Sequence, residues 1–316
     1  MSRLAWIECR NLPEIRRIKL LHAAREDEDV VQGFGFTILH QSLLGILPRD
    51  LLDTSTVIYQ HLDTPDTHGW TPLHWATKLE DADAVRKLTS LGCKIDARNS
   101  IAETPLHIAC WQNSIECTAL LLEAGANIQV KCAADCSPLY NAASQPNCPV
   151  ALMEVLCRYL PAADDAYRDA EINIAFDFAG RENNVPLMRY LEGQGVIINP
   201  DPADTDGFTP LLWAIRYDAE DAARYLYEAG ASLKPVNSWG YNMLHMACYG
   251  AEASLMRYLA TLDLPEIDPD LRDEDGHTPE EGFRLTRPEV DEAEKQELRD
   301  AWGELVSAVR RAWEQC

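Results

Sequence analysis

The sequence predicts an all-α fold in which helix–turn–helix units stack into a solenoid, and two observations carry this prediction. A four-residue motif recurs at a spacing of 33 or 34 residues along much of the chain. Each copy opens a short apolar segment, and a second apolar segment follows it. A repeat of this length is one supersecondary unit, which buries its apolar face only against its neighbours. We therefore expect about seven to eight stacked repeats.

The motif has the residues of a helix start. Threonine caps a helix, as at Thr71, and proline fits the first turn, as at Pro72, because no N–H is needed there. The second segment ends in Gly125 or Gly230, and glycine accepts the left-handed conformation that follows a helix. The copies are Thr37-Ile38-Leu39-His40, Thr71-Pro72-Leu73-His74, Thr104-Pro105-Leu106-His107, Ser137-Pro138-Leu139-Tyr140, Thr209-Pro210-Leu211-Leu212 and Asn242-Met243-Leu244-His245, with Thr278-Pro279 starting a degraded one.

These motifs resemble the ankyrin repeat, whose signature is Thr-Pro-Leu-His-x-Ala at a period of about 33 residues. The resemblance covers about residues 34–285. It implies helix pairs separated by β-turn fingers, and turn signals such as Asp206-Gly207 agree with it. It also implies that His74, His107 and His245 hydrogen-bond to neighbouring backbone and are structural, not catalytic.

The array is irregular between Ser137 and Thr209, which lie 72 residues apart. A diverged central repeat at about residues 165–203 accounts for this gap, with expected helices at 171–179 and 185–192. It lacks the capping motif, and a short insert follows it. Insertions in repeat proteins often map to the binding face, whereas surface loops also tolerate insertion at little cost. Both interpretations stay open.

We expect capping helices at both ends of the array, because terminal repeats need a polar outer face. Residues 1–33 contain an amphipathic segment at 13–24, and residues 286–316 contain a longer one at 288–313. The longer helix is predicted to cover the last repeat with an apolar stripe, and a partner-binding helix is the alternative. The stripe consists of Leu298, Trp302, Leu305, Val306, Val309 and Trp313.

The charge of the chain limits its partners. It has 28 basic and 51 acidic residues and a formal net charge of −23. This balance repels phosphate backbones and anionic membranes, so we expect neither nucleic acid nor a membrane as partner. A basic protein or peptide is the better electrostatic match, although acidity is also a common means of solubility. We expect the chain itself to be a monomer.

The ten cysteines do not form tight pairs, and several lie in apolar helical segments. This usage predicts free thiols in a reducing compartment, the cytoplasm or the nucleus. No signal peptide and no membrane-spanning segment are expected. Cys132, Cys136, Cys148 and Cys157 loosely suggest zinc, but structural zinc sites usually have tighter ligand pairs. The sequence therefore predicts no metal and no cofactor.

The resemblance to ankyrin repeats implies that a partner is held by the fingertips and the inner surface of the first helices. Aromatic residues recur at these positions, and interfaces favour tryptophan and tyrosine as anchors. In the alternative, these aromatic side chains pack on each other between repeats. Trp111 and Tyr217 are predicted to flank a groove at the central repeat, whereas Trp75 and Trp213 are expected in the core. The predicted partner-binding residues are Trp70, Lys78, Trp111, Gln112, Phe208, Arg216, Tyr217, Trp239, Tyr241 and Tyr249.

The sequence therefore favours a protein–protein interaction module: an adaptor, scaffold, regulatory subunit or chaperone that binds a partner on its concave face. An enzyme with a pocket near residues 176–184 is the alternative. No catalytic motif such as G-x-S-x-G, H-E-x-x-H or C-x-x-C occurs in the chain. Since activity has to be argued from a site, the sequence indicates no catalytic residues.

Overall fold

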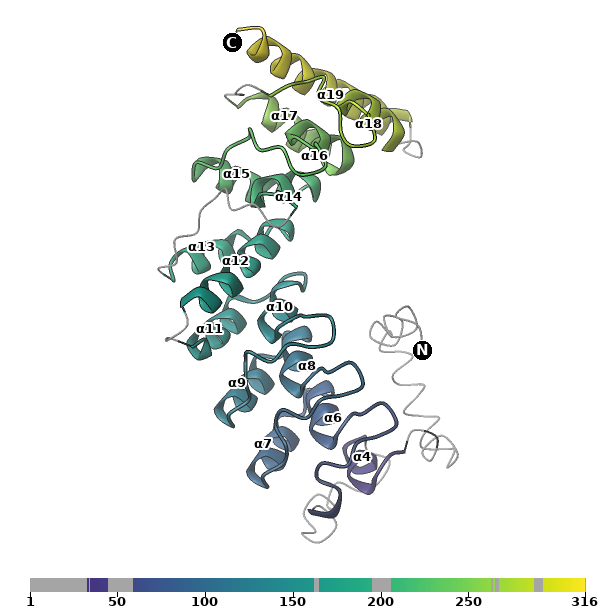
Figure 1. The fold of residues 1–316 in the computed structure, drawn as a ribbon, viewed down its shortest axis with the longest axis vertical. Coiled ribbons are helices and arrows are strands. Elements are labelled where there is room, and N and C mark those ends of the chain that lie inside the picture. The colour runs from purple at the N-terminus through teal and green to yellow at the C-terminus, as the bar shows by residue number, and fades with distance from the viewer. Residues whose placement is uncertain are drawn as a thin grey trace. The chain divides into compact units, whose positions relative to one another are not determined.

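The structure confirms the all-α repeat architecture. It is a computed structural model that describes residues 33, 35–44, 59–161, 165–194, 206–262, 264, 267–286 and 292–315. Within these ranges the regular elements are helices, and no strand is present. After α4, the described helices follow one another as pairs, each pair being one repeat (Figure 1).

The helices keep the order that the repeat predicts. The first helices of the repeats are α4 (Ile38–Leu43), α6 (Pro72–Lys78), α8 (Pro105–Trp111), α10 (Pro138–Ala143), α12 (Asp165–Arg181), α14 (Pro210–Arg216), α16 (Met243–Gly250) and α18 (Pro279–Thr286). The second helices are α7 (Ala82–Ser90), α9 (Ile115–Glu123), α11 (Val150–Tyr159), α13 (Val185–Glu192), α15 (Glu220–Glu228), α17 (Ala253–Ala260) and α19 (Glu292–Trp313).

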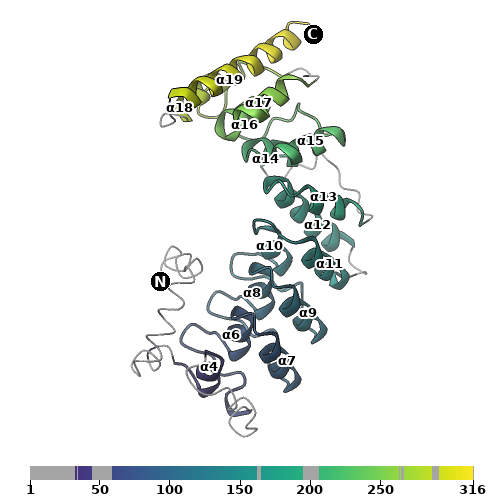
Figure 2. The same ribbon diagram turned by 180° about the vertical axis from the view of Figure 1, so that it is seen from behind.

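The chain divides into two compact units, which we describe separately. Unit 1 comprises residues 1–142 and 154–160, and unit 2 comprises residues 143–153 and 161–316. In unit 1, α4, α6 and α8 stack side by side, and α7 packs on α9. In unit 2, α12, α14, α16 and α18 form one row, while α13 packs on α15 and α17 packs on α19 (Figure 2).

A buried histidine links each well-formed repeat to the next finger. In the second repeat, the backbone N–H of Thr71 donates to His74 Nδ1 at 3.1 Å, so this nitrogen carries no proton. The other ring nitrogen, Nε2, therefore carries the proton and donates to the carbonyl oxygen of Glu103 at 3.2 Å. The corresponding bonds join His40 to Trp70, His107 to Cys136 and His245 to His277. The structural role that the resemblance implied for these histidines is confirmed.

Four of the described fingers are tight turns closed by an Asp or Asn side chain. In the first of them, Asp66 Oδ1 accepts hydrogen bonds from the backbone N–H groups of His68 and Trp70 at 2.8 and 2.9 Å. Consecutive fingers are also joined by backbone bonds, as from Ser100 N to His68 O at 3.0 Å. The same Asx pattern recurs at Asn99, Asn237 and Asp273.

One position of each finger takes the left-handed conformation. Gly69 has a φ of 78°, and a Cβ atom there would lie 2.9 Å from Ser100 N on the next finger. Glycine is required at this position for both reasons. In the next finger the same place is held by Ala102, with a φ of 61°. An L-residue with a Cβ atom is strained in this region of φ/ψ space, so the Ala102 finger stores local strain.

The contact between α14 and α16 also depends on a glycine. A Cβ atom built on Gly250, at the end of α16, would lie 1.5 Å from the carbonyl oxygen of Arg216, at the end of α14. Because the obstacle is backbone, no larger residue fits unless one of the two helices moves.

The central repeat consists of α12 and α13. The second helix, α13, has the predicted bounds of residues 185–192. The first helix is longer than predicted, because it begins at Asp165 and runs to Arg181. Residues 165–170, which precede the predicted helix, therefore belong to α12 as well. The insert at 198–203 lies outside the described residues.

The C-terminal helix α19 covers α17 as predicted. Leu298, Trp302, Leu305 and Val309 of its apolar stripe are buried. Val306 is only half-buried. The buried part of the stripe ends at Val309, because Trp313 is 43% exposed. Residues 287–291 and the predicted N-terminal helix at 13–24 lie outside the described residues.

We predict opposite effects for reciprocal substitutions in two neighbouring fingers. Ala102→Gly should raise the free energy of unfolding by about 1 kcal/mol, because it relieves the positive φ. Gly69→Ala should lower it by about 1–3 kcal/mol, because it adds the same strain and a contact with the next finger. Urea denaturation of both variants measures the difference. Destabilisation by Ala102→Gly would contradict the assignment of strain.

We predict that the stability of the protein falls between pH 6.5 and about pH 4 through its linking histidines. Burial lowers the pKa of His74 from 6.5 to about 4, and it also lowers the pKa values of His40 and His245. Below pH 6.5 these histidines therefore bind protons in the unfolded chain while they stay neutral in the folded protein. The stabilisation is complete above pH 6.5 and is lost as the pH falls through this window, with up to roughly 3 kcal/mol from His74.

Urea denaturation across this pH range tests the histidine prediction. His74→Gln should flatten the dependence of the unfolding free energy on pH between 6.5 and 4.5. The control is His68→Gln, which changes a half-buried histidine of the neighbouring finger. Equal slopes in wild type and His74→Gln would contradict the prediction.

Candidate protein-binding surface

Aromatic side chains of unit 2 form one connected group, which we call the aromatic cluster. Phe208 stacks on Trp213 with ring centroids 4.1 Å apart and meets Trp239 edge-on at 5.3 Å. Trp239 in turn contacts Tyr241 at 6.1 Å. These rings come from α14 and from the fingers on either side of it, so the cluster follows the row of first helices. Its members are Phe208, Trp213, Tyr217, Trp239, Tyr241 and Tyr249.

Two arginines of the chain lie against this cluster. The Arg181 guanidinium, at the end of α12, lies 3.9 Å from the centroid of the Trp213 ring. The Arg216 guanidinium lies 5.1 Å from the centroid of the Tyr249 ring. A cation over an aromatic face is attracted by the ring quadrupole, by about 0.5–2 kcal/mol. The rings of this cluster therefore already serve as guanidinium-binding faces within the chain.

The exposure of the cluster is uneven. Tyr217 is 55% exposed and Trp239 is 37% exposed, whereas Trp213, Tyr241 and Tyr249 are half-buried. Phe208, which the sequence placed at an exposed fingertip, is only 3% exposed because it lies beneath Trp213 and Trp239. It supports the surface but offers it almost no contact area.

The expectation that Trp75 and Trp213 lie in the core is wrong. Both are half-buried and stand at the surface of the first helices, where they pack against finger residues. Trp75 Nε1 donates to Asp66 Oδ2 at 2.9 Å, and the Trp75 ring meets Trp70 at 5.3 Å and Phe36 at 5.5 Å. This second aromatic group belongs to unit 1.

The remaining predicted contact residues of unit 1 are half-buried on α8 and α6. Gln112 Nε2 donates to the carbonyl oxygen of Lys78 at 3.0 Å and to Glu80 Oε1 at 3.3 Å. Gln112 thus bridges two repeats, and its amide group is partly used for that purpose. Trp111 and Lys78 lie at this same surface.

The fingertip aromatic side chains do pack on each other, as the alternative interpretation of the sequence predicted. Tyr241 contacts Tyr249 at 5.5 Å, and burial together with the Tyr241 hydroxyl raises the pKa of Tyr249. Both rings are held by their neighbours yet keep part of their surface exposed. Packing and exposure therefore occur together, and packing makes the exposed rings rigid.

The residues proposed for a catalytic pocket at 176–184 have structural contacts. Asn184 Oδ1 caps α13 through Leu187 N, and its amide donates to the carbonyl oxygen of Cys148 at 2.9 Å. Asn183 Oδ1 accepts from Ala222 N at 2.8 Å. Phe176 is buried. These contacts give Asn183 and Asn184 structural roles.

The eight described cysteines are free thiols, and burial raises the pKa values of Cys93 and Cys148 to about 12. Such thiols are poor nucleophiles at neutral pH. Within the described ranges, no three His, Cys, Asp or Glu side chains are placed to hold a metal ion. In the same ranges, no helix has the length and apolar character needed to cross a membrane.

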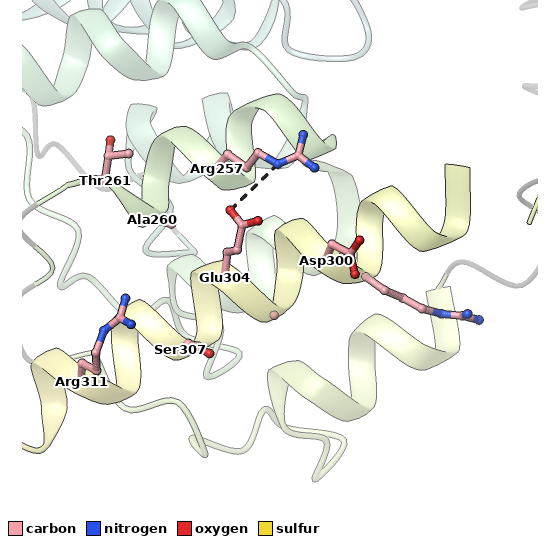
Figure 3. A pocket seen from close by; sticks show the side chains of 9 residues that line it. Arg257, Ala260, Thr261, Asp300, Glu304, Ser307 and Arg311 are labelled. Carbon is pink, nitrogen blue, oxygen red and sulfur yellow. Dashed lines mark ion pairs between the residues drawn. The ribbon is translucent and has the colours of Figure 1, made fainter. Parts of the chain in front are cut away.

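A depression of about 810 Å³ lies between α17 and α19 (Figure 3). Its lining carries both signs of charge, and Arg257 Nε lies 4.0 Å from Glu304 Oε2. Arg257 also pairs with Glu297 at 2.9 Å. The depression is polar and its charges largely compensate each other, which is typical of a solvated surface between two helices.

The stacked helix pairs define a class: solenoid proteins built from helical repeats, which commonly bind other proteins. Comparison with known families then specifies the repeat. Residues 49–132 match a family model of ankyrin repeats in three copies, and residues 211–260 match a second ankyrin-repeat model. The chain is an ankyrin-repeat protein.

Two human relatives and one solved structure agree with this assignment. The ankyrin and armadillo repeat-containing protein of Homo sapiens is 23% identical over 65% of this chain and 12% of its own length. The human ankyrin repeat and SOCS box protein 16 is 30% identical over 68% of this chain and 48% of its own length. The human ASB11 ankyrin repeat domain shares the fold, with 22% identity, a TM-score of 0.55 and coverage of 73% of this chain and 98% of that one. The chain thus spans less than half of either relative.

We predict that Asp66→Asn destabilises unit 1 by about 1–3 kcal/mol. The asparagine keeps the acceptor for the finger backbone, but its amide group faces the N–H of Trp75 and leaves that donor unpaired. Urea denaturation measures the loss. The control is Asp83→Asn, because Asp83 is almost fully exposed and pairs only with Arg86 on the surface. Equal stability of the two variants would count against this bond.

Proposed function

We propose that this chain is a protein–protein interaction module that binds its partner through the aromatic cluster of unit 2. The observation that carries the proposal is the exposure of Tyr217 and Trp239, which pack on the half-buried ring of Trp213 and the buried ring of Phe208. Large exposed aromatic side chains are unfavourable in water unless a partner covers them. The rings beneath hold them in place, which lowers the entropy lost on binding.

The charge of the chain favours a basic partner. A net charge of −23 attracts a positively charged surface and accelerates the encounter at low salt. The free thiols agree with work in a reducing compartment, the cytoplasm or the nucleus. The role of the chain as adaptor, scaffold, regulatory subunit or chaperone depends on that partner.

Other predicted residues belong to the proposed surface in different degrees. Tyr217, Trp239, Tyr241, Tyr249 and Arg216 form its centre in unit 2. Trp70, Lys78, Trp111 and Gln112 are a separate candidate surface in unit 1. Phe208 acts from below as support.

We predict that Tyr217→Ala with Trp239→Ala weakens binding of the native partner by about 1,000-fold, since buried aromatic anchors often contribute about 2 kcal/mol each. The partner is first captured from the native source at moderate salt, and its affinity is then measured by titration calorimetry with the purified full chain. The fold of the variant is checked by circular dichroism.

Trp313→Ala is the matched control, because Trp313 is a similarly exposed tryptophan on α19 outside the cluster. It should leave the affinity unchanged. If the double variant binds as tightly as wild type, the proposed surface is wrong.

A further inference from the structure

The fingertips of unit 2 place an exposed aromatic ring between acidic residues. Ser238 N and Ser238 Oγ donate to the carbonyl oxygen of Asp206 at 2.9 and 2.8 Å, and Glu274 N donates to the carbonyl oxygen of Trp239 at 3.0 Å. In this ladder Asp206 and Asp275 hold the position of Trp239 in the preceding and following fingers, and Glu274 is bonded directly to the Trp239 backbone. Adjacent backbones joined in this way lie about 5 Å apart.

The acidic groups on both sides of Trp239 reach solvent. Asp206, Glu274 and Asp275 are exposed. The nearest arginine of these fingers, Arg272, is bonded to the carbonyl oxygen of Gly276 and to Glu281. Its charge is therefore largely compensated, and the fingertip keeps an excess of negative charge.

The corresponding fingertips of unit 1 have no such chemistry. There the position of Trp239 is held by His68, Ile101 and Ala134, which follow the same backbone ladder. The acidic–aromatic–acidic order is therefore a property of particular side chains in unit 2 and not of the repeat.

The neighbouring rings show what such a surface can bind. The Trp213 and Tyr249 faces already have the guanidinium groups of Arg181 and Arg216 over them, at 3.9 and 5.1 Å. No arginine or lysine of the described residues lies over Trp239, whose ring contacts are with Phe208 and Tyr241. Trp239 thus keeps an accessible aromatic surface in an acidic surrounding.

We propose that this fingertip binds an arginine side chain of the partner protein, with the guanidinium stacked on Trp239 and its N–H groups donating to Asp206 and Glu274. The inference deepens the proposed function and rests on it. A planar guanidinium can stack and donate to carboxylates on both sides at once, whereas the compact ammonium of lysine cannot. Tryptophan is also the aromatic residue that attracts cations most strongly.

Three fluorescein-labelled peptides test the proposal by fluorescence anisotropy with the full chain. They share the sequence (Gly-X)4, where X is arginine, lysine or citrulline, the neutral isostere of arginine. We expect the arginine peptide to bind about 10-fold more tightly than the citrulline peptide and about 3-fold more tightly than the lysine peptide. Trp239→Ala should remove most of the preference for arginine over citrulline, and Trp239→Phe should keep part of it.

Further variants separate this site from general attraction to an acidic chain. Asp206→Asn with Glu274→Gln should weaken arginine binding by about 10-fold and reduce its salt dependence. Trp313→Ala, at the exposed tryptophan of α19, should change nothing. An unchanged arginine preference in Trp239→Ala, or an equal loss in Trp313→Ala, would overturn the proposal.

The two proposals fail in distinguishable ways. If Trp239→Ala weakens the native partner while the arginine peptide binds no better than citrulline, the arginine site is wrong and the proposed function stands. If the peptides show the expected preference and the native partner is indifferent to the cluster, the fingertip binds arginine but the proposed function is wrong.

Discussion

The link between a buried histidine and the carbonyl oxygen of the next finger joins four of the described repeats to their neighbours. The same side chain holds the start of its own helix through Nδ1 and reaches the following repeat through Nε2. It therefore couples local capping to the stacking of repeats. The neutral imidazole is essential, because a second ring proton would remove the acceptor that binds the threonine N–H. This link positions the fingers that end at Trp70, Glu103, Cys136 and His277. The finger of Trp239 follows a repeat that has Leu212 in place of the histidine.

Much of the fold could be predicted because its signals are local. Thr71, Pro72 and His74 begin a helix by their own chemistry, and the repeat shows where the next helix begins. The start of α12 was harder to predict, because no capping motif marks Asp165 and the acidic residues there suggest a solvated loop. Their helix is stabilised by packing on α13 and α14, which the sequence does not reveal.

The candidate site could be predicted only in part. The repeat register pointed to Tyr217, Trp239 and Tyr241, and in the structure these rings are connected through Trp213 and Phe208. The same register gave the wrong burial for Phe208 and Trp213. It assigns each position to the core or the surface and does not take the neighbouring side chains into account. A large neighbouring ring covers Phe208 and leaves Trp213 half-exposed. Arg181 carried no sequence signal, since its role depends on the approach of α12 to α14.

Gly250 connects this surface to the spacing of two neighbouring repeats. Its lack of a side chain lets the end of α16 rest directly on the Arg216 carbonyl, beside the turn that carries Tyr217. The separation of α14 and α16 is therefore set by a contact between backbones, and no flexible side chain lies between the two helices at this point. The distance between the aromatic residues of these two helices is therefore held fixed by the same contact. The spacing of the aromatic side chains on these two helices is therefore set by the absence of a single methyl group at position 250.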